Sequence, residues 1–357
     1  DETSRGLGDV YKRQQFDSSK FDALKITKKI KMPLDKNFNK RKLDAMIVKN
    51  EGIPFQLEAI NEVRVNKSAV EKRCASATNR RTVKKHNQVA WLLKAITCMD
   101  LTTLSGDDTE SRVVRLCNKA KTPLRNDLLK KLGIEDLNIK VGGICVYHQF
   151  IRTALGALQG STIPVVAVST GFPAGHTPKK TKITEIKESI RSGAQEIDIV
   201  ISRRHVLSGN WKKLYDEVSE YKQASGTACL KTILATGELG TLKNCLLAAL
   251  ICMMAGANFI KTSTGKESIN ATLPFTLVMC RAIREYRECT GFEVGYKPAG
   301  GISSAKDCLS HMMLVKEELG SKWLHPSLFR VGASSLLSDI ERQIEPVSYT
   351  HLTLPTT

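Results

Sequence analysis

Short apolar runs rich in β-branched residues alternate with longer segments of helical period from residue 95 to residue 335, and this alternation restricts the fold more than any other feature. Eight such runs predict strands at 95–100, 143–147, 164–169, 196–201, 229–234, 259–262, 294–297 and 329–331. Helices are predicted between them at 111–121, 184–192, 211–224, 242–254, 273–286 and 305–319. Eight β-α units in roughly 250 residues match a (β/α)8 barrel, so we predict an α/β protein of the TIM-barrel class.

A doubly wound sheet is the main alternative for this alternation. Such a sheet carries its glycine-rich phosphate turn after the first strand. Here the first predicted strand ends in Asp100-Leu101-Thr102-Thr103, and glycine-rich turns follow the last three strands instead. Barrels bind phosphate mainly on the loops after strands seven and eight, so the position of the glycines favours the barrel.

The two ends of the chain are expected to be foreign to the protein. The codons GAT GTG TAT AAG AGA CAG can encode residues 9–14, and their reverse complement in another frame encodes the sequence of residues 347–351. This relation predicts translated sequencing adaptors at residues 1–14 and 347–357, which we exclude from the fold prediction.

The remaining segments outside the barrel differ in pattern. Residues 15–57 are polar, lysine-rich and weakly periodic, which predicts a disordered basic extension or a translated leader. Residues 58–94 contain a helical pattern at 83–93, and we expect a helical N-terminal extension that caps the bottom or side of the barrel. The barrel itself is predicted for residues 95–346.

The net charge of +18 would suit a protein that binds nucleic acid. The excess is densest in residues 1–45 and 58–94, and the rest is spread along the chain without an aromatic-interleaved groove. This distribution favours a protein that handles small anions. A basic nucleic-acid-binding protein on a passive barrel scaffold is the alternative of a different class.

Cysteine and histidine spacing predicts no metal and no cofactor. The ten cysteines form no Cys-x-x-Cys pair, and the seven histidines show no ligand spacing. The cysteines are therefore expected to be reduced thiols in a cytoplasmic protein. No apolar run reaches the roughly 18 residues that a membrane span needs.

Two predicted strands end in a lysine. Lys261 ends strand six after an apolar run, and Lys297 ends strand seven, so adjacent strands would bring both amines into one cavity. Burial and like charge would make each lysine resist protonation, and a neutral amine is a nucleophile. We predict an imine-forming enzyme, with a salt-bridged barrel rim as the structural alternative.

Further polar residues lie at strand positions that face such a cavity. Asp198, between apolar neighbours in strand four, is predicted to pair with a lysine and relay protons. Asp100 and Thr102 would either orient a substrate or cap the next helix. Cys145, in strand two, is expected to be a core thiol near the substrate.

Glycine and serine residues after strands six to eight predict a phosphate site. Their backbone N–H groups, and a positive helix end beside the two serines, can bind an anion. The candidate residues are Gly265, Gly300, Gly301, Gly332, Ser334 and Ser335.

Together these segments resemble the deoxyribose-phosphate aldolase family in its eukaryotic form. The resemblance covers roughly residues 60–346. It rests on the segments 99–104 (MDLTTL), 196–200 (EIDIV), 231–239 (KTILATGEL), 259–266 (FIKTSTGK), 295–301 (GYKPAGG) and 332–337 (GASSLL).

The resemblance implies a metal-free class I aldolase that reversibly splits 2-deoxyribose 5-phosphate into glyceraldehyde 3-phosphate and acetaldehyde. By resemblance, Lys261 forms the Schiff base, Asp198 and Lys297 move protons, and Lys266 joins the phosphate glycines and serines. Asp100 and Thr102 would lie near the sugar hydroxyls. The expected partners are small molecules, with a homo-oligomer possible and no membrane.

The chain departs from the family pattern in two places. Many members carry an arginine where this chain has Ile302-Ser303, which shifts the expected phosphate contacts to backbone donors and Lys266. Members also carry a tail tyrosine that assists proton transfer, and Tyr349 lies in the expected adaptor and does not match it. Another class I sugar-phosphate aldolase, such as a transaldolase-like protein, is the alternative within this fold.

Overall fold

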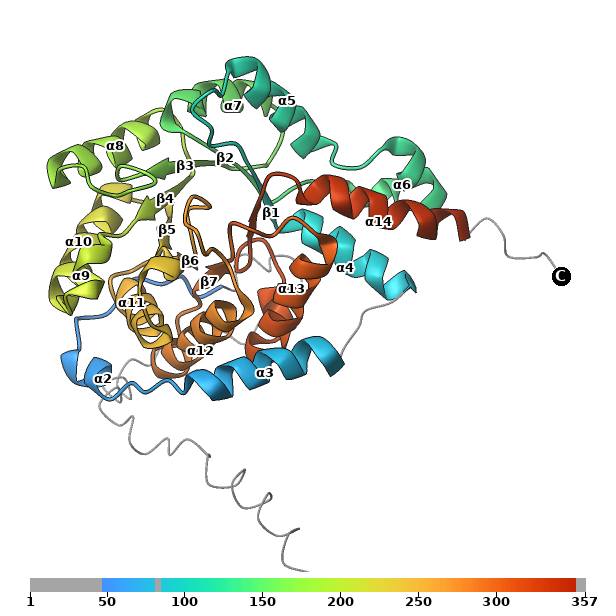
Figure 1. Cartoon of the computed structure of the whole chain (residues 1–357). Coiled ribbons are helices and arrows are strands. Elements are labelled where there is room, and N and C mark those ends of the chain that lie inside the picture. Colours follow the sequence, from blue (N-terminus) through green and yellow to red (C-terminus); the bar gives the residue numbers. More distant parts are fainter. Residues whose placement is uncertain (1–46, 81–84, 351–357) are drawn as a thin grey trace, which may run out of the picture.

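Eight parallel strands form a barrel in the computed structural model, which describes residues 47–80 and 85–350 (Figure 1). The sheet order is β7-β6-β5-β4-β3-β2-β1-β8, and bridges from Tyr296 to Phe329 and from Ala299 to Gly332 join β7 to β8. The strands are β1 Met99–Thr102, β2 Gly143–Val146, β3 Val165–Ser169, β4 Glu196–Val200, β5 Cys229–Ile233, β6 Phe259–Lys261, β7 Gly295–Lys297 and β8 Val331–Ala333. The predicted TIM-barrel class is confirmed.

Helices surround the strands in Figure 1. They are α5 Glu110–Lys121, α6 Asn126–Leu132, α7 Ile151–Ala157, α8 Lys179–Arg191, α9 Arg203–Leu207, α10 Trp211–Ser225, α11 Leu242–Met254, α12 Leu273–Thr290, α13 Ala305–Leu319 and α14 Leu336–Thr350. Short 3-10 turns lie at η3 Glu135–Leu137, η4 His148–Phe150, η5 Thr236–Glu238 and η6 Ser321–Trp323. Three short helices of the barrel, α6, α7 and α9, have too few turns for a clear helical period, and the sequence prediction missed them.

The first strand begins later than predicted. Residues 95–97 belong to α4 Lys85–Thr97, because Ala95 and Ile96 continue the buried face of that helix with Leu92. An apolar run that ends a helix and begins a strand gives no sign of the boundary between them.

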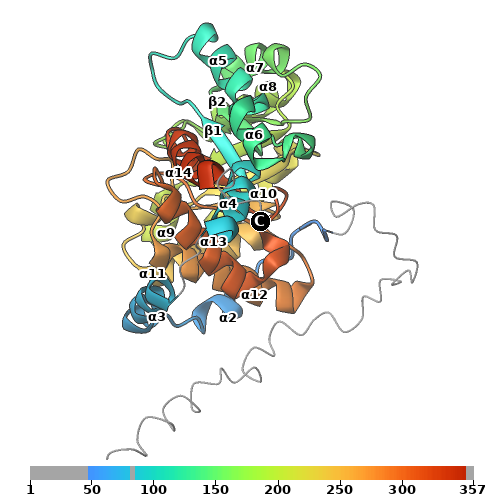
Figure 2. The same ribbon diagram turned by 90° about the vertical axis from the view of Figure 1, so that its right-hand side faces the viewer.

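Three N-terminal helices lie along the side of the barrel. They are α2 Leu57–Asn61, α3 Lys67–Arg80 and α4. The α3 helix packs against α12 and α13, and α4 packs against α13 and α14 (Figure 2). The cap expected for residues 58–94 therefore covers one flank of the helical ring.

Residues 47–57, the end of the segment expected to be an extension, contact the bottom of the barrel. The Asn50 amide donates to the carbonyls of Met253 and Ala257, each at 2.8 Å, and Glu293 N–H donates to the carbonyl of Val48. The expectations for residues 1–14 and for residues 15–46 lie outside the described residues.

Each strand turns alternate side chains inward, and the inward positions hold the charged residues of the molecule's centre. Glycines make room for them. A Cβ at Gly143 would lie 2.7 Å from Asp100 Oδ1 and 2.8 Å from Arg330 Nη1. A Cβ at Gly295 would lie 2.3 Å from the Phe259 ring.

Within the described part of the chain, no helix is both long and apolar enough to cross a membrane.

Candidate active site

Asp198 lies between the two predicted lysines at the centre of the barrel. Its Oδ2 accepts from Lys261 Nζ and from Lys297 Nζ, each at 2.8 Å. The register pairs Lys261 with Lys297 across β6 and β7, as the strand positions predicted. One carboxylate oxygen thus offers a short path for a proton between two amines.

Asp100 completes the contacts of Lys297. Its Oδ2 lies 2.5 Å from Lys297 Nζ, and its Oδ1 accepts from Arg330 Nη1 at 2.5 Å. Asp100 therefore holds a network lysine, and it does not cap the following helix, whose N-cap is Thr109. The capping interpretation of Asp100 is therefore excluded, and its role in orienting a substrate stays a prediction.

A second group of charged residues, Lys231, Glu196 and Arg330, contacts Asp198 and Asp100. Lys231 donates to Asp198 Oδ1 at 3.1 Å and also to Glu196. Glu196 accepts from Arg330 at 2.8 Å, so that Arg330 links Glu196 to Asp100. The network holds three carboxylates and four basic groups, all largely buried.

The electrostatics of the network favour charged groups. Burial opposes the charge on Asp198, but Lys231, Lys261 and Lys297 together hold the pKa of its carboxyl well below the ordinary value. Burial also opposes the charge on Lys297, but Asp100 and Asp198 raise its pKa above the ordinary value. The expectation that Lys297 would resist protonation was therefore wrong, because it left out the carboxylates.

Lys261 is the lysine of the network that solvent can reach. Its exposed fraction is 3%, whereas Lys231 and Lys297 are 0% exposed. Because β6 ends at Lys261, its Nζ lies where the strand opens into the loop of residues 262–272.

The other predicted substrate residues lie on β1 and β2. Thr102 donates to the carbonyl of Asp100 at 2.9 Å. Cys145 is buried with Leu104, Val166 and Val168 in a small apolar cluster inside the barrel, and burial raises the pKa of its thiol. Cys145 is thus a core thiol that borders the charged network.

The predicted phosphate glycines meet at one end of the barrel. A Cβ at Gly265 would lie 3.9 Å from Gly300 Cα, and the bridge from Ala299 to Gly332 joins the loop after β7 to strand β8. Gly265, Gly300 and Gly301 have positive φ angles of 87°, 80° and 78°, which suit glycine. The three loops therefore form one continuous rim.

The rim carries backbone donors without protein acceptors. Among the described residues, no acceptor is found for the N–H groups of Gly300, Gly301, Ser334 and Ser335. The two serines are exposed just before α14 begins, at the positive end of that helix. Such donors can bind an anion.

Glu267 already occupies part of the loop after β6. Its carboxylate accepts from Thr264 N–H at 3.0 Å and from Gly265 N–H at 3.1 Å. Gly265 thus contributes a turn, and its N–H is engaged. Lys266 is exposed beside it.

Sequence reasoning missed four charged residues here: Glu196, Lys231, Glu267 and Arg330. Glu196 and Lys231 lie at strand positions whose side chains face the same side of the sheet as Asp198, namely the inside of the barrel. The alternation of side chains along an apolar strand could have identified both from the sequence. Arg330 precedes β8 and Glu267 lies in a loop, so strand parity does not identify either.

A (β/α)8 barrel with a buried aspartate-bridged lysine pair, and a donor-rich rim beside it, defines a protein of the TIM-barrel aldolase class. The protein-family model described as "DeoC/LacD family aldolase" matches residues 94–338 of this chain. The chain belongs to this family and is an aldolase.

Two curated relatives share most of the chain. A human protein named deoxyribose-phosphate aldolase is 55% identical over 310 residues, covering 86% of this chain and 96% of its own length. A mouse protein of the same name is 56% identical over 304 residues, covering 85% of this chain and 94% of its own length.

Solved structures confirm the fold. A putative deoxyribose-phosphate aldolase from Toxoplasma gondii ME49 superposes with a TM-score of 0.62 at 22% identity, covering 75% of this chain and 98% of that chain. The deoxyribose phosphate aldolase from Aeropyrum pernix, described as a tetramer, gives 0.55 at 20% identity, covering 77% of this chain and 97% of that chain.

Proposed function

We propose that this aldolase reversibly cleaves 2-deoxyribose 5-phosphate to glyceraldehyde 3-phosphate and acetaldehyde by a class I, Schiff-base mechanism. The observation that carries the proposal is the contact of Asp198 Oδ2 with both Lys261 and Lys297, together with the family membership. An amine that forms an imine needs a proton donor and acceptor beside it, and this geometry supplies one.

In the proposed reaction, Lys261 Nζ attacks C1 of the open-chain sugar to give a carbinolamine. Loss of water then yields an imine that withdraws electrons from the C2–C3 bond. A base removes the proton of the C3 hydroxyl, the C2–C3 bond breaks, and glyceraldehyde 3-phosphate leaves. The remaining enamine takes a proton at C2, and water releases acetaldehyde and the free amine.

Asp198 and Lys297 would move the protons for these steps. The carbinolamine hydroxyl must gain a proton before water leaves, and Lys297 is a charged donor held by Asp100 and Asp198. The network has one more basic group than carboxylates, so a single neutral amine leaves the buried charges balanced. This balance supports a nucleophilic lysine within a charged barrel.

The rim would hold the substrate phosphate. Gly300, Gly301, Ser334 and Ser335 supply unengaged N–H donors, and exposed Lys266 adds a positive charge. Asp100, Thr102 and Cys145 would lie on the other side of the proposed site. Binding the phosphate at the rim leaves C1 free to reach Lys261.

The proposal is tested by assaying acetaldehyde release from 2-deoxyribose 5-phosphate and the reverse condensation. We expect both, and we expect no transfer of a dihydroxyacetone unit between sugar phosphates. Transfer without acetaldehyde release would identify a transaldolase-like aldolase and overturn the proposal.

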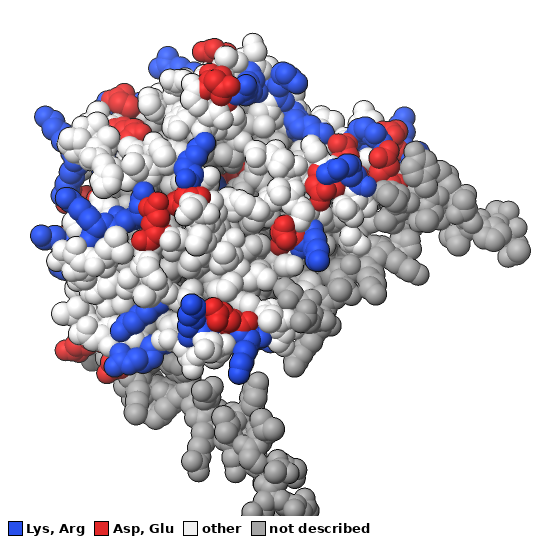
Figure 3. All heavy atoms as spheres, viewed as in Figure 1, with Lys and Arg blue, Asp and Glu red and all other residues white. Residues whose placement is uncertain are grey.

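The biological setting is part of the proposal. The reaction would serve the catabolism of deoxyribonucleosides in the cytoplasm, in line with ten free cysteines. Assembly into a homo-oligomer is proposed from the tetramer described for the Aeropyrum pernix structure. On the face in Figure 3, acidic and basic side chains are interspersed, which supports small-molecule partners over nucleic acid.

A further inference from the structure

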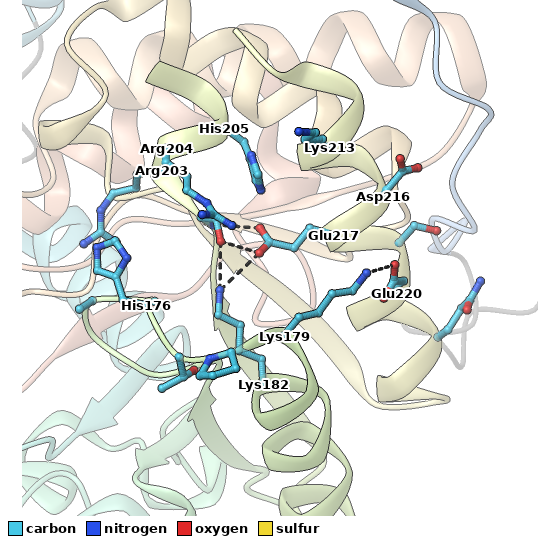
Figure 4. A pocket seen from close by; sticks show the side chains of 17 residues that line it. His176, Lys179, Lys182, Arg203, Arg204, His205, Lys213, Asp216, Glu217 and Glu220 are labelled. Atoms are coloured by element: carbon cyan, nitrogen blue, oxygen red, sulfur yellow. Dashed lines mark hydrogen bonds and ion pairs between the residues drawn. The ribbon is translucent and has the colours of Figure 1, made fainter. Parts of the chain in front are cut away.

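A cavity of about 800 Å³ lies between α8 and α10, apart from the lysine network (Figure 4). It is lined by the loop after β3, the start of α8, the short helix α9 and one face of α10. No residue of the charged network or of the phosphate rim lines it. Its charged lining residues are Lys179, Lys182, Arg203, Arg204, Lys213, Asp216, Glu217 and Glu220.

Every carboxylate of this lining is already paired. Glu217 accepts from Lys182 at 3.3 Å, Glu220 pairs with Lys179, and Asp216 pairs with Lys212 on the same helix. The acidic residues of the cavity are therefore neutralised within the protein.

The positive charge of the lining is not balanced. Five lysines and arginines face three carboxylates, and Arg203 pairs with Glu238 outside the cavity. Arg204 and Lys213 have no ion-pair partner among the described residues, and His176 and His205 also line the cavity. Basic side chains gather over α8 and α10 at the left edge of Figure 3.

The wall of the cavity is built of buried polar groups. Lys182 donates to Ser202 Oγ at 3.0 Å, and Ser202 donates to Glu217 through its N–H at 3.0 Å and its hydroxyl at 2.5 Å. Tyr221 donates to Glu217 at 2.9 Å. This buried and satisfied network gives the cavity a fixed polar wall, and Arg204 and Lys213 are exposed beside it.

The lining also indicates the kind of ligand. The cavity lies within the roughly 300–1,000 Å³ range of small-molecule pockets. Among the described residues, no Phe, Tyr or Trp lines it, so these residues offer no aromatic ring on which a nucleobase could stack. A compact ligand whose binding rests on negative charge fits this lining best.

We propose that this cavity is a second anion site, which binds a compact polyanion with two phosphate groups and no aromatic ring, such as pyrophosphate or a bisphosphorylated sugar. Arg204 and Lys213 supply the unpaired charge, and His176 and His205 supply further donors. This site is independent of the proposed aldol reaction, whose substrate carries one phosphate at a different place.

The pKa of His205 can report whether an anion binds in this cavity. Burial lowers the pKa of its imidazole; Glu217 opposes this effect, and Arg204 and Lys213 lower the pKa further. An anion bound beside these cations must therefore raise that pKa, by about one unit or more for a charge within contact distance. NMR titration of the histidine ring protons with and without pyrophosphate measures this change, with exposed His148 as the internal control.

Two charge-matched double variants locate the effect. Arg204→Gln with Lys213→Gln removes the unpaired cations, and Arg115→Gln with Lys187→Gln removes exposed cations outside the cavity. We expect pyrophosphate to raise the pKa of His205 in the native protein and in the second variant, and not in the first, with aldol cleavage within two-fold of native throughout.

An unchanged pKa of His205 with pyrophosphate in the native protein, or an equal rise in the Arg204/Lys213 variant, would overturn the proposal. Inorganic phosphate is the second probe. It should require at least tenfold higher concentration than pyrophosphate, and equal potency would overturn the two-phosphate assignment. Native aldol cleavage is measured separately, so failure of this site is distinguishable from failure of the proposed reaction.

Discussion

At the scale of single residues, Asp198 is the group on which the account depends most. Its two oxygens accept from three lysines, and no water-exposed surface remains on its carboxyl. A group that both neutralises and connects these lysines has a structural role and a chemical role at once.

Replacing Asp198 by Asn keeps its size and removes its charge. We expect kcat for deoxyribose 5-phosphate cleavage to fall about 10²- to 10⁴-fold, as is typical when a general acid–base is lost. Asp127→Asn, on the exposed surface of α6, is the matched control. If D198N folds and turns over at the control's rate, Asp198 moves no proton in the reaction.

His311 predicts a pH dependence of stability. It lies buried between α12 and α13 with its Nδ1 2.7 Å from Thr276 Oγ1, and burial lowers its pKa from 6.5 to about 4. The folded protein keeps His311 neutral while the unfolded chain binds a proton below pH 6.5, so stability falls as the pH falls from 6.5 to 4. The loss is on the order of 3 kcal/mol.

Urea unfolding of the native protein and of His311→Asn across this pH range measures that contribution. Asn keeps a polar atom near Thr276 and cannot titrate. The variant's stability should change less between pH 6.5 and pH 4, and parallel curves would contradict the assignment.

At the scale of elements, an inward-facing glycine on β7 makes room for a large inward-facing side chain on β6. Phe259 pairs with Gly295 in the register, and its ring fills the space that a Cβ would need. A side chain at Gly295 would therefore overlap the Phe259 ring unless one of the two groups moved.

Gly295→Ala should lower the free energy of unfolding by about 1–3 kcal/mol through overpacking. Adding Phe259→Leu should recover part of this loss, which a double-mutant cycle detects. Gly156→Ala in α7 is the control, since its Cβ would meet nothing within 4 Å. Additive effects of the two barrel substitutions would show that the clash does not govern stability.

The order of elements could be predicted from sequence, because each strand and long helix carries its own period. The boundary between α4 and β1 could not, since one apolar run continues through both. The position of Lys261 beside Lys297 followed from adjacent strands. The partners of Asp198 on β5 depended on a register, Asp198 opposite Lys231, that no local pattern specifies. The Arg330 contacts depended on barrel closure in the same way.

At the scale of the whole molecule, residues 47–57 join the N-terminal flank to the bottom of the barrel. Asn50 is the principal tie, since its amide also accepts from Tyr286 at 2.9 Å and from Gly52 N–H at 3.1 Å. Truncation of the Asn50 side chain would remove the hydrogen-bond partner of the Met253 and Ala257 carbonyls, the Tyr286 hydroxyl and the Gly52 N–H at once.

Asn50→Ala should cost about 1–3 kcal/mol of unfolding free energy, because it leaves buried donors and acceptors unsatisfied. Asn118→Ala, exposed on α5, should stay within about 0.5 kcal/mol of native. Denaturant unfolding of both variants makes the comparison. Equal unfolding free energies for the two variants would mean that residues 47–57 do not stabilise the barrel.

The central claim is that Lys261 forms a covalent imine, and one measurement tests it directly. The protein is incubated with acetaldehyde, reduced with borohydride, digested and mapped by mass spectrometry. The account predicts a two-carbon adduct on Lys261 that is absent from Lys261→Arg. An adduct on another lysine with Lys261 unlabelled, or no adduct in a protein that still cleaves the substrate, would contradict it.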